Sequence, residues 1–181
     1  MHVKGNAWLA RSEYLQKTFG DQRWKAFLAT QKQVPFLQQQ VLPISRIEAA
    51  EFLAVNDAIV RHFYAGDQQV YWRFGEQSAE WALRNQLRTL FQPKEGRRFL
   101  QFSPTIYKGY FDGGELVTEA AGPDVDLVIR GVEPRHVYFE FSILGFAAGG
   151  LRVLEVPCEP KCVLGYSKGD TEVRYRFAVA S

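Results

Sequence analysis

The segment GYSKG at 165–169 has the Gly-x-Ser-x-Gly pattern that presents a nucleophilic serine in many hydrolases. In those enzymes a strand–turn–helix holds the serine, and an acid and a histidine that follow in the chain activate it. Here the last histidine is His136, and only 12 residues follow Gly169. The segment therefore predicts a turn between two strands, and we do not expect Ser167 to be catalytic. No other pattern indicates an enzyme.

Three residues near the middle of the C-terminal half have metal-ligand chemistry at helical spacing. Glu133, His136 and Glu140 form one Glu-x-x-His motif, whereas a di-iron bundle needs two such motifs and two further carboxylates. We interpret Glu133 as a helix start and His136–Glu140 as an i,i+4 pair. His62 is predicted at the boundary of the core.

The two cysteines, Cys158 and Cys162, lie four residues apart in CEPKC. A tetrahedral zinc site needs four ligands, and no other cysteine or histidine lies nearby in the sequence. We expect buried thiols, with a metal or redox role as the alternative, and we predict no metal site and no cofactor.

A basic segment is the best candidate for contact with an anion or a partner protein. Its members lie within fifteen residues, opposed only by Glu95, and they include Arg84, Arg88, Arg97 and Arg98. The alternative is a solvated face of the monomer. The net charge of +2 is too small to indicate nucleic acid. In VRYRF (173–177) the aromatic residues share a face with valines, so they are expected in the core rather than stacked on bases.

The segment 141–151 is uncharged over 11 residues, and a membrane-spanning helix needs about 20. We therefore expect no membrane span and, because the N-terminus lacks a long apolar stretch, a cytoplasmic protein. Gly145 and Gly149 line one stripe of the expected helix. A glycine inside a helix costs about 1 kcal/mol relative to alanine, so the stripe indicates a close approach. Either the helix packs tightly across the sheet or against the helix at 46–64, or the stripe leaves a groove for an apolar ligand or a second subunit.

The elements that position these residues follow from caps, breakers and periodicity. Ser45 and Glu48 have the spacing of a capping box, and Ser103-Pro104 resembles a helix start. We expect helices over 6–19, 46–64, 68–90, 93–102, 103–112 and 134–149, with a short one after Asp21. ELVTEA (115–120) and VDLVIRG (125–131) predict one hairpin, and CVLGY (162–166) and VRYRFAVA (173–180) a second. The prediction is a single α+β domain over 1–181, with a helical N-terminal two-thirds packed on a small antiparallel sheet in β-β-α-β-β order.

Several short pieces together resemble a known superfamily. They are Phe141, Gly145-Phe146, Gly149-Gly150-Leu151, Lys168-Gly169-Asp170 and Phe177, with the N-terminal segment VKGNAWLARSEYLQKTFGDQRWKAFLA. They are similar to 4-vinyl-reductase-type domains, the TRAPP vesicle-tethering subunits and the heme-NO-binding sensors, and most of all to an uncharacterised family expanded in myxobacteria. The resemblance implies helices over an antiparallel sheet, an internal hydrophobic pocket, and a sensing or scaffolding role. The Tyr-x-Ser-x-Arg motif of the heme-NO-binding sensors is absent, and 94–112 contains no histidine.

We therefore expect a non-enzymatic bacterial signalling domain that binds a small apolar ligand or a protein partner and acts as a dimer. The predicted ligand-binding residues are Phe63, Tyr107, Tyr138, Gly145, Phe146 and Gly149. The alternative function is a gas or redox sensor that binds heme or a metal through His62 or His136.

Overall fold

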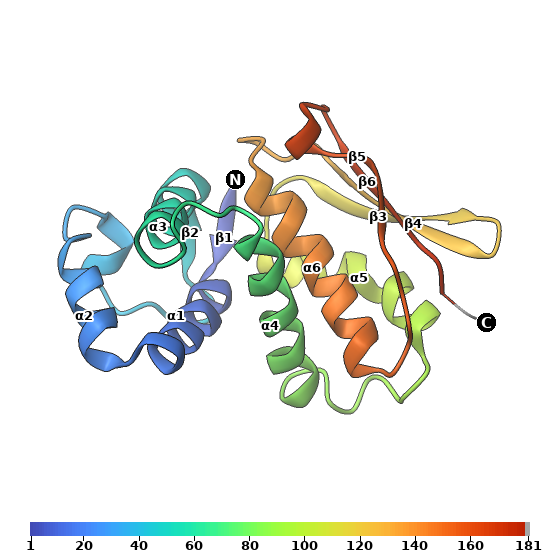
Figure 1. The fold of residues 1–181 in the computed structure, drawn as a ribbon, viewed down its shortest axis with the longest axis horizontal. Coiled ribbons are helices and arrows are strands. Elements are labelled where there is room, and N and C mark those ends of the chain that lie inside the picture. The colour runs from blue at the N-terminus through green and yellow to red at the C-terminus, as the bar shows by residue number, and fades with distance from the viewer. Residues whose placement is uncertain (180–181) are drawn as a thin grey trace.

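The N-terminal third is a helical lobe in the computed structural model, which describes residues 1–179. It contains α1 (Gly5–Phe19), α2 (Asp21–Ala29), the short 3-10 helix η1 (Pro35–Gln38) and α3 (Ala49–Phe63). A small antiparallel pair, β1 (His2–Lys4) and β2 (Arg46–Glu48), joins the two ends of this lobe. Figure 1 shows the lobe at one end of an elongated molecule.

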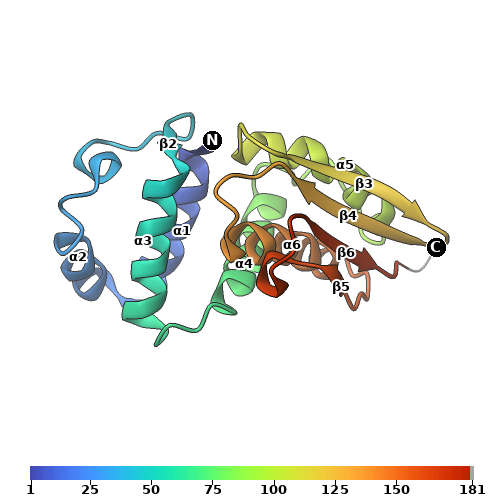
Figure 2. The ribbon, with the colours of Figure 1, turned by 90° about the horizontal axis from the view of Figure 1, so that it is seen from above.

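The rest of the chain is a sheet with helices on one side. Its elements are α4 (Val70–Arg84), α5 (Gly96–Tyr110), β3 (Glu115–Ala121), β4 (Asp124–Arg130), α6 (Val137–Val153), β5 (Lys161–Leu164), the 3-10 helix η2 (Tyr166–Lys168) and β6 (Val173–Phe177). The strands are antiparallel in the order β3-β4-β6-β5. Figures 1 and 2 show α4 and α6 side by side, with α5 next to them under the sheet. The predicted α+β class, with its helical first part and its β-β-α-β-β order, is confirmed.

Both hairpins form as predicted, and the alternation is clearest in β6, where every second residue is buried. In the first, Val117 lies opposite Val128. In the second, η2 occupies the turn, and Val173, Tyr175 and Phe177 point into the core. Ala180, the last residue of the expected second strand, lies outside the described residues. Within residues 1–179, the structure contains no helix with the length and apolar character needed to cross a membrane.

The expected division of 93–112 into two helices is wrong, because α5 runs through Pro104 without a break. Phe99, Leu100 and Tyr107 are buried on the same side of α5, so packing on both sides of the proline keeps the helix continuous. The Ser103 hydroxyl donates to the Phe99 carbonyl at 3.2 Å and does not cap a new helix. The preceding helix, α4, ends at Arg84 rather than at residue 90.

The expected capping box is also wrong. The Ser45 hydroxyl accepts a hydrogen bond from the Leu42 amide at 2.9 Å, and α3 begins only at Ala49. Residues 46–48 are extended because they pair with β1, with Val3 opposite Ile47. The sequence pattern missed this pairing because the two strands are only three residues long and lie more than 40 residues apart.

Helix α6 begins at Val137, three residues after the expected Pro134, and continues to Val153. His136 caps it, since its Nδ1 accepts a hydrogen bond from the Tyr138 amide at 3.0 Å. Glu133 therefore does not start the helix, and it pairs with Arg135 instead.

Candidate functional site

The glycine stripe of α6 faces α4. A Cβ added at Gly149 would lie 2.6 Å from the Glu76 Cα, and one at Gly145 would meet the Trp72 carbonyl oxygen. Gly75 of α4 makes the matching close contact, since a Cβ there would meet the backbone of α6. The stripe therefore brings two helices of the same chain into backbone contact. Its partner is α4 rather than the sheet or the helix expected at 46–64, so Gly145 and Gly149 do not face an external ligand.

A partly open cavity of about 50 Å³ lies beside this helix pair, between α1, α4, α5, α6 and the strands β3 and β4. Its apolar lining residues are Ala7, Ile106, Phe111, Leu116, Leu127, Ile143, Phe146 and Ala147. Its polar lining residues are Ser78, Ser103, Tyr107, Tyr110, Tyr138 and Ser142. Such a mixture of apolar walls and a few hydroxyls is typical of small-molecule sites.

Three of the six hydroxyls of the lining donate to carbonyl groups of the protein. Ser78 and Ser103 donate to carbonyls of their own helices, and Tyr107 donates to the Gly113 carbonyl at 2.7 Å. Burial raises the pKa of Tyr107 and raises the pKa of Tyr110 to about 12, so both phenols are neutral at physiological pH. Tyr110 and Tyr138 are the phenols that remain for contact with a ligand.

The Tyr138 hydroxyl lies next to the buried guanidinium of Arg11. Arg11 of α1 is 2% exposed, and its guanidinium carbon lies 3.4 Å from the centre of the Phe74 ring. Burial lowers the pKa of Arg11 to about 10, while the nearby Tyr138 hydroxyl opposes that shift. The side chain therefore carries its charge at neutral pH inside the protein.

The remaining predicted ligand-binding residues separate in space. Tyr107, Tyr138 and Phe146 line the cavity, but Phe63 lies in the N-terminal lobe. There it stacks on Phe19, with ring centres 4.4 Å apart. Phe63 is therefore part of the packing between α1, α2 and α3 rather than of the cavity.

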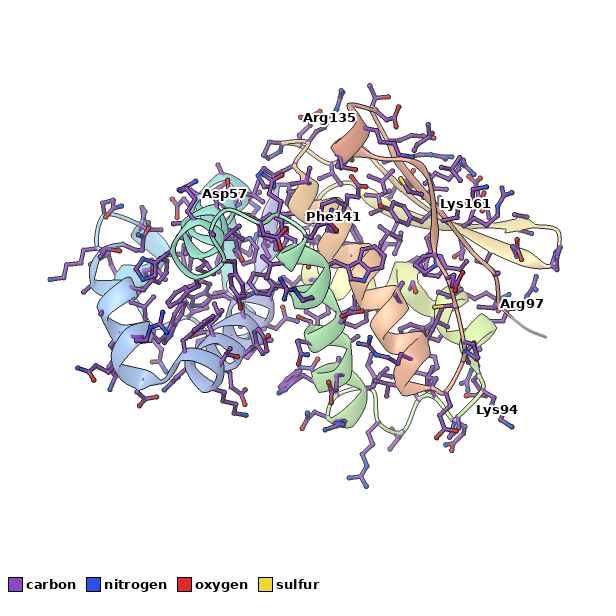
Figure 3. The ribbon with its side chains drawn as sticks, viewed as in Figure 1. Asp57, Lys94, Arg97, Arg135, Phe141 and Lys161 are labelled. Carbon is purple, nitrogen blue, oxygen red and sulfur yellow. The ribbon has the colours of Figure 1, made fainter. Side chains whose placement is uncertain are left out.

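Three of the four arginines of the basic segment make local contacts, and Arg84 lies beside α1 of the N-terminal lobe. Arg84 pairs with Glu80 at 2.7 Å and Arg98 with Glu95 at 2.8 Å. Arg97, labelled in Figure 3, donates to the Pro123 carbonyl, and Arg88 is exposed. An anion or partner site at these residues stays a prediction.

His136 and His62 both lie outside the cavity lining. His136 Nε2 lies 3.3 Å from Asp57 Oδ2, and the Tyr71 hydroxyl also donates to Asp57. Burial raises the pKa of Asp57, but the hydrogen bonds from these two residues outweigh burial and leave it lowered. Asp57 comes from α3, so this group joins the N-terminal lobe to α4 and α6 (Figure 3). His62 is exposed and packs its ring against Phe63.

The expected His136–Glu140 pair does not form, because Glu140 faces the other way. It is fully buried and accepts hydrogen bonds from the Ser167 amide at 2.7 Å, the Ser167 hydroxyl at 2.8 Å and the Tyr175 hydroxyl at 2.8 Å. The serine of the Gly-x-Ser-x-Gly segment thus anchors the turn between β5 and β6 to α6. The turn predicted from this segment is confirmed.

Cys158 and Cys162 are free thiols, and both are half-buried rather than buried. Burial raises the pKa of Cys158. Within residues 1–179, no three side chains of the His, Cys, Asp or Glu type gather closely enough to hold a metal ion.

The arrangement of the whole chain matches solved structures at low sequence identity. An H-NOX mutant from S. oneidensis in the Fe(II) ligation state aligns with a TM-score of 0.78 and 12% identity, over 98% of this chain and 96% of that one. An H-NOX mutant from K. algicida aligns with a TM-score of 0.73 and 13% identity, over 98% and 97%. An oxygen-binding H-NOX domain related to soluble guanylate cyclases aligns with a TM-score of 0.72 and 11% identity, over 98% and 95%.

This chain has the H-NOX fold. The match extends over nearly the whole chain, whereas the sequence pieces that resembled heme-NO-binding sensors were short. No protein-family model and no curated protein sequence matches the chain. The fold class behind that resemblance is therefore confirmed, while membership of the myxobacterial family stays a prediction.

Solved H-NOX structures are described with Fe(II) and heme, so the cavity must be tested against a heme. Among residues 1–179, no histidine lines it, and its basic neighbour Arg11 is not part of the lining. Its volume of about 50 Å³ is too small for a macrocycle. The residues of this H-NOX-fold chain do not fit a heme.

Sequence reasoning missed Ser78, Tyr110, Ser142 and Arg11. One signal was available for Arg11, since Trp8, Arg11 and Leu15 follow each other at helical spacing and all three are buried. An arginine on the apolar face of a helix indicates a buried charge. No pattern in the sequence would have brought Ser78 and Tyr110 to the same cavity.

Proposed function

We propose that this chain is a non-enzymatic signalling domain that senses a small apolar ligand in the cavity under the sheet. The observation that supports the proposal is the cavity itself, with apolar walls and the Tyr110 and Tyr138 phenols. The fold agrees with it, because solved H-NOX domains include an oxygen-binding domain related to guanylate cyclases. A second copy of the chain or a signalling partner would bind differently to the ligand-bound and ligand-free forms.

The position of the cavity suggests how binding is transmitted. Ala7 belongs to the N-terminal lobe, while the other lining residues belong to α4, to α5 and the residue that follows it, to α6 and to the sheet. A ligand in the cavity therefore contacts both lobes and favours the lobe arrangement with which it makes more contacts.

A matched pair of α6 variants tests the cavity. Ala147 lines the cavity, whereas Ala148 lines a separate surface groove. With 1-hexanol as the probe, we expect Ala147→Leu to lose binding and Ala148→Leu to retain it. At 100 times its dissociation constant, a ligand stabilises the native state by about 2.7 kcal/mol, which thermal unfolding detects. Equal binding by both variants would count against the cavity as the site.

Heme binding is the second candidate, and the fold match over 98% of the chain is what favours it. Heme iron can be held by tyrosine instead of histidine in some proteins. The purified chain, mixed with hemin, should show only the spectrum of free hemin. A shifted Soret band that is lost in Tyr110→Phe or Tyr138→Phe would replace our proposal with a heme sensor.

A further inference from the structure

Arg11 is a buried cation without an apparent acidic partner among residues 1–179. Its Nε atom is buried without a hydrogen-bond partner there, and the groups that act most strongly on its charge are tyrosine hydroxyls. Stacking on Phe74 stabilises a guanidinium but does not neutralise it. A buried charge is costly unless it is paired, so the site is suited to an anion that the protein itself does not supply.

Arg11 lines a groove of about 230 Å³ between α1 and α4. The other charged residues of the groove form ion pairs. Lys17 Nζ lies 2.5 Å from Glu13 Oε1, and a guanidinium nitrogen of Arg84 lies 2.7 Å from Glu80 Oε1. Their charges cancel, and the net charge of the groove is the single positive charge of Arg11.

The groove and the cavity share a wall. Ser78 lines both of them. Ala7, which lines the cavity, lies one helical turn before Arg11 on α1. The Tyr138 hydroxyl faces Arg11, and the same side chain lines the cavity. The cavity therefore adjoins the guanidinium across Ser78 and Tyr138.

We infer that the ligand of the cavity is an apolar carboxylate, with its hydrocarbon part in the cavity and its anionic group paired with Arg11. The inference rests on the proposed function of the cavity. The planar guanidinium matches a carboxylate with two parallel hydrogen bonds, a geometry that a lysine cannot reproduce. Tyr64, whose buried hydroxyl has no partner within the described residues and which also acts on Arg11, supplies a further donor nearby.

The test uses two probes that differ only in the anionic group, hexanoate and 1-hexanol, measured by isothermal titration calorimetry on the full chain. We expect the wild type to bind hexanoate at least about 10-fold more tightly, the usual effect of a charge-assisted hydrogen bond. Arg11→Met should remove this preference and leave 1-hexanol binding unchanged. Lys17→Met is the matched control, because Lys17 lines the same groove but is exposed and paired with Glu13, and its binding should equal the wild type. If Arg11→Met does not fold, Arg11→Lys should keep the charge and weaken hexanoate binding by a smaller factor.

The outcomes separate the two proposals. Equal affinity of the wild type for both probes, or hexanoate binding that survives in Arg11→Met, overturns the role of Arg11 and leaves the apolar cavity in place. Binding of neither probe overturns the proposed function of the cavity, and the inference with it.

Discussion

The contact between α4 and α6 predicts that Gly149→Ala destabilises the protein, although alanine is the better helix former. The added Cβ would lie 2.6 Å from the Glu76 Cα, about 0.8 Å closer than the 3.4 Å at which ordinary contacts begin. The neighbour is backbone, so the helices must separate. Overpacking of this kind costs about 1–3 kcal/mol, and we take the upper end because no side chain can move aside. The gain in helix propensity is about 1 kcal/mol, so a net loss of about 2 kcal/mol is expected.

Thermal unfolding monitored by circular dichroism measures this difference. For a chain of 181 residues, 1 kcal/mol shifts Tm by about 2–4 °C, so Gly149→Ala should lower Tm by about 4–8 °C. Gly109→Ala is the matched control, because Gly109 is also helical and no described atom lies within 4 Å of a Cβ added there. Its Tm should stay the same or rise by a few degrees, by about 1 kcal/mol of helix propensity at most. A Tm for Gly149→Ala equal to or above the wild type would refute the close-packing argument.

Three further predictions concern buried or paired carboxylates. Glu140→Gln should cost about 1–3 kcal/mol in urea unfolding, because one of the two acceptor oxygens becomes an NH2 donor that faces either the Ser167 amide or the hydroxyls of Ser167 and Tyr175. Asp57→Asn should lower the free energy of unfolding by a similar amount, because it weakens the contacts with Tyr71 and His136 that join the two lobes. Proteolysis between α3 and α4 should become faster. The pKa of Asp126 is lowered by hydrogen bonds and charge from Arg176 and then Arg174, so its contribution to stability is complete above its ordinary pKa of 3.8 and is lost as the pH falls through the lower pKa of the folded state. The urea midpoints of the wild type and Asp126→Asn should therefore keep a constant difference down to about pH 4 and converge as the pH falls further, and a difference that stays constant below pH 3.8 would contradict this assignment.

Three of the residues predicted to bind a ligand, Tyr107, Tyr138 and Phe146, lie together around the cavity. They were recognisable as large side chains on the buried faces of elements that the sequence pattern had already located. Phe63 belongs to the same class of residue and lies in the other lobe. Periodicity shows that a side chain is buried, but it does not show which buried space the side chain borders.

The sequence by itself determined the helical first part, both hairpins and the uncharged segment 141–151 within α6. These features depend on contacts between neighbours in the chain, such as turns at Gly122-Pro123 and Lys168-Gly169-Asp170 and alternation along each strand. The glycines of α6 also indicated a close approach, because glycine at helical spacing weakens a helix unless a neighbouring backbone packs against it.

Only the tertiary structure decided which element packs against the glycines of α6. Gly149 faces α4, Pro104 lies inside a continuous helix, and residues 46–48 pair with the N-terminus, because each outcome depends on an element distant in the sequence. Arg11 is the clearest case. Its place on the apolar face of α1 could be read from the spacing, but whether acidic side chains surround a buried cation is a property of every segment packed around it, and those segments meet only in the folded chain.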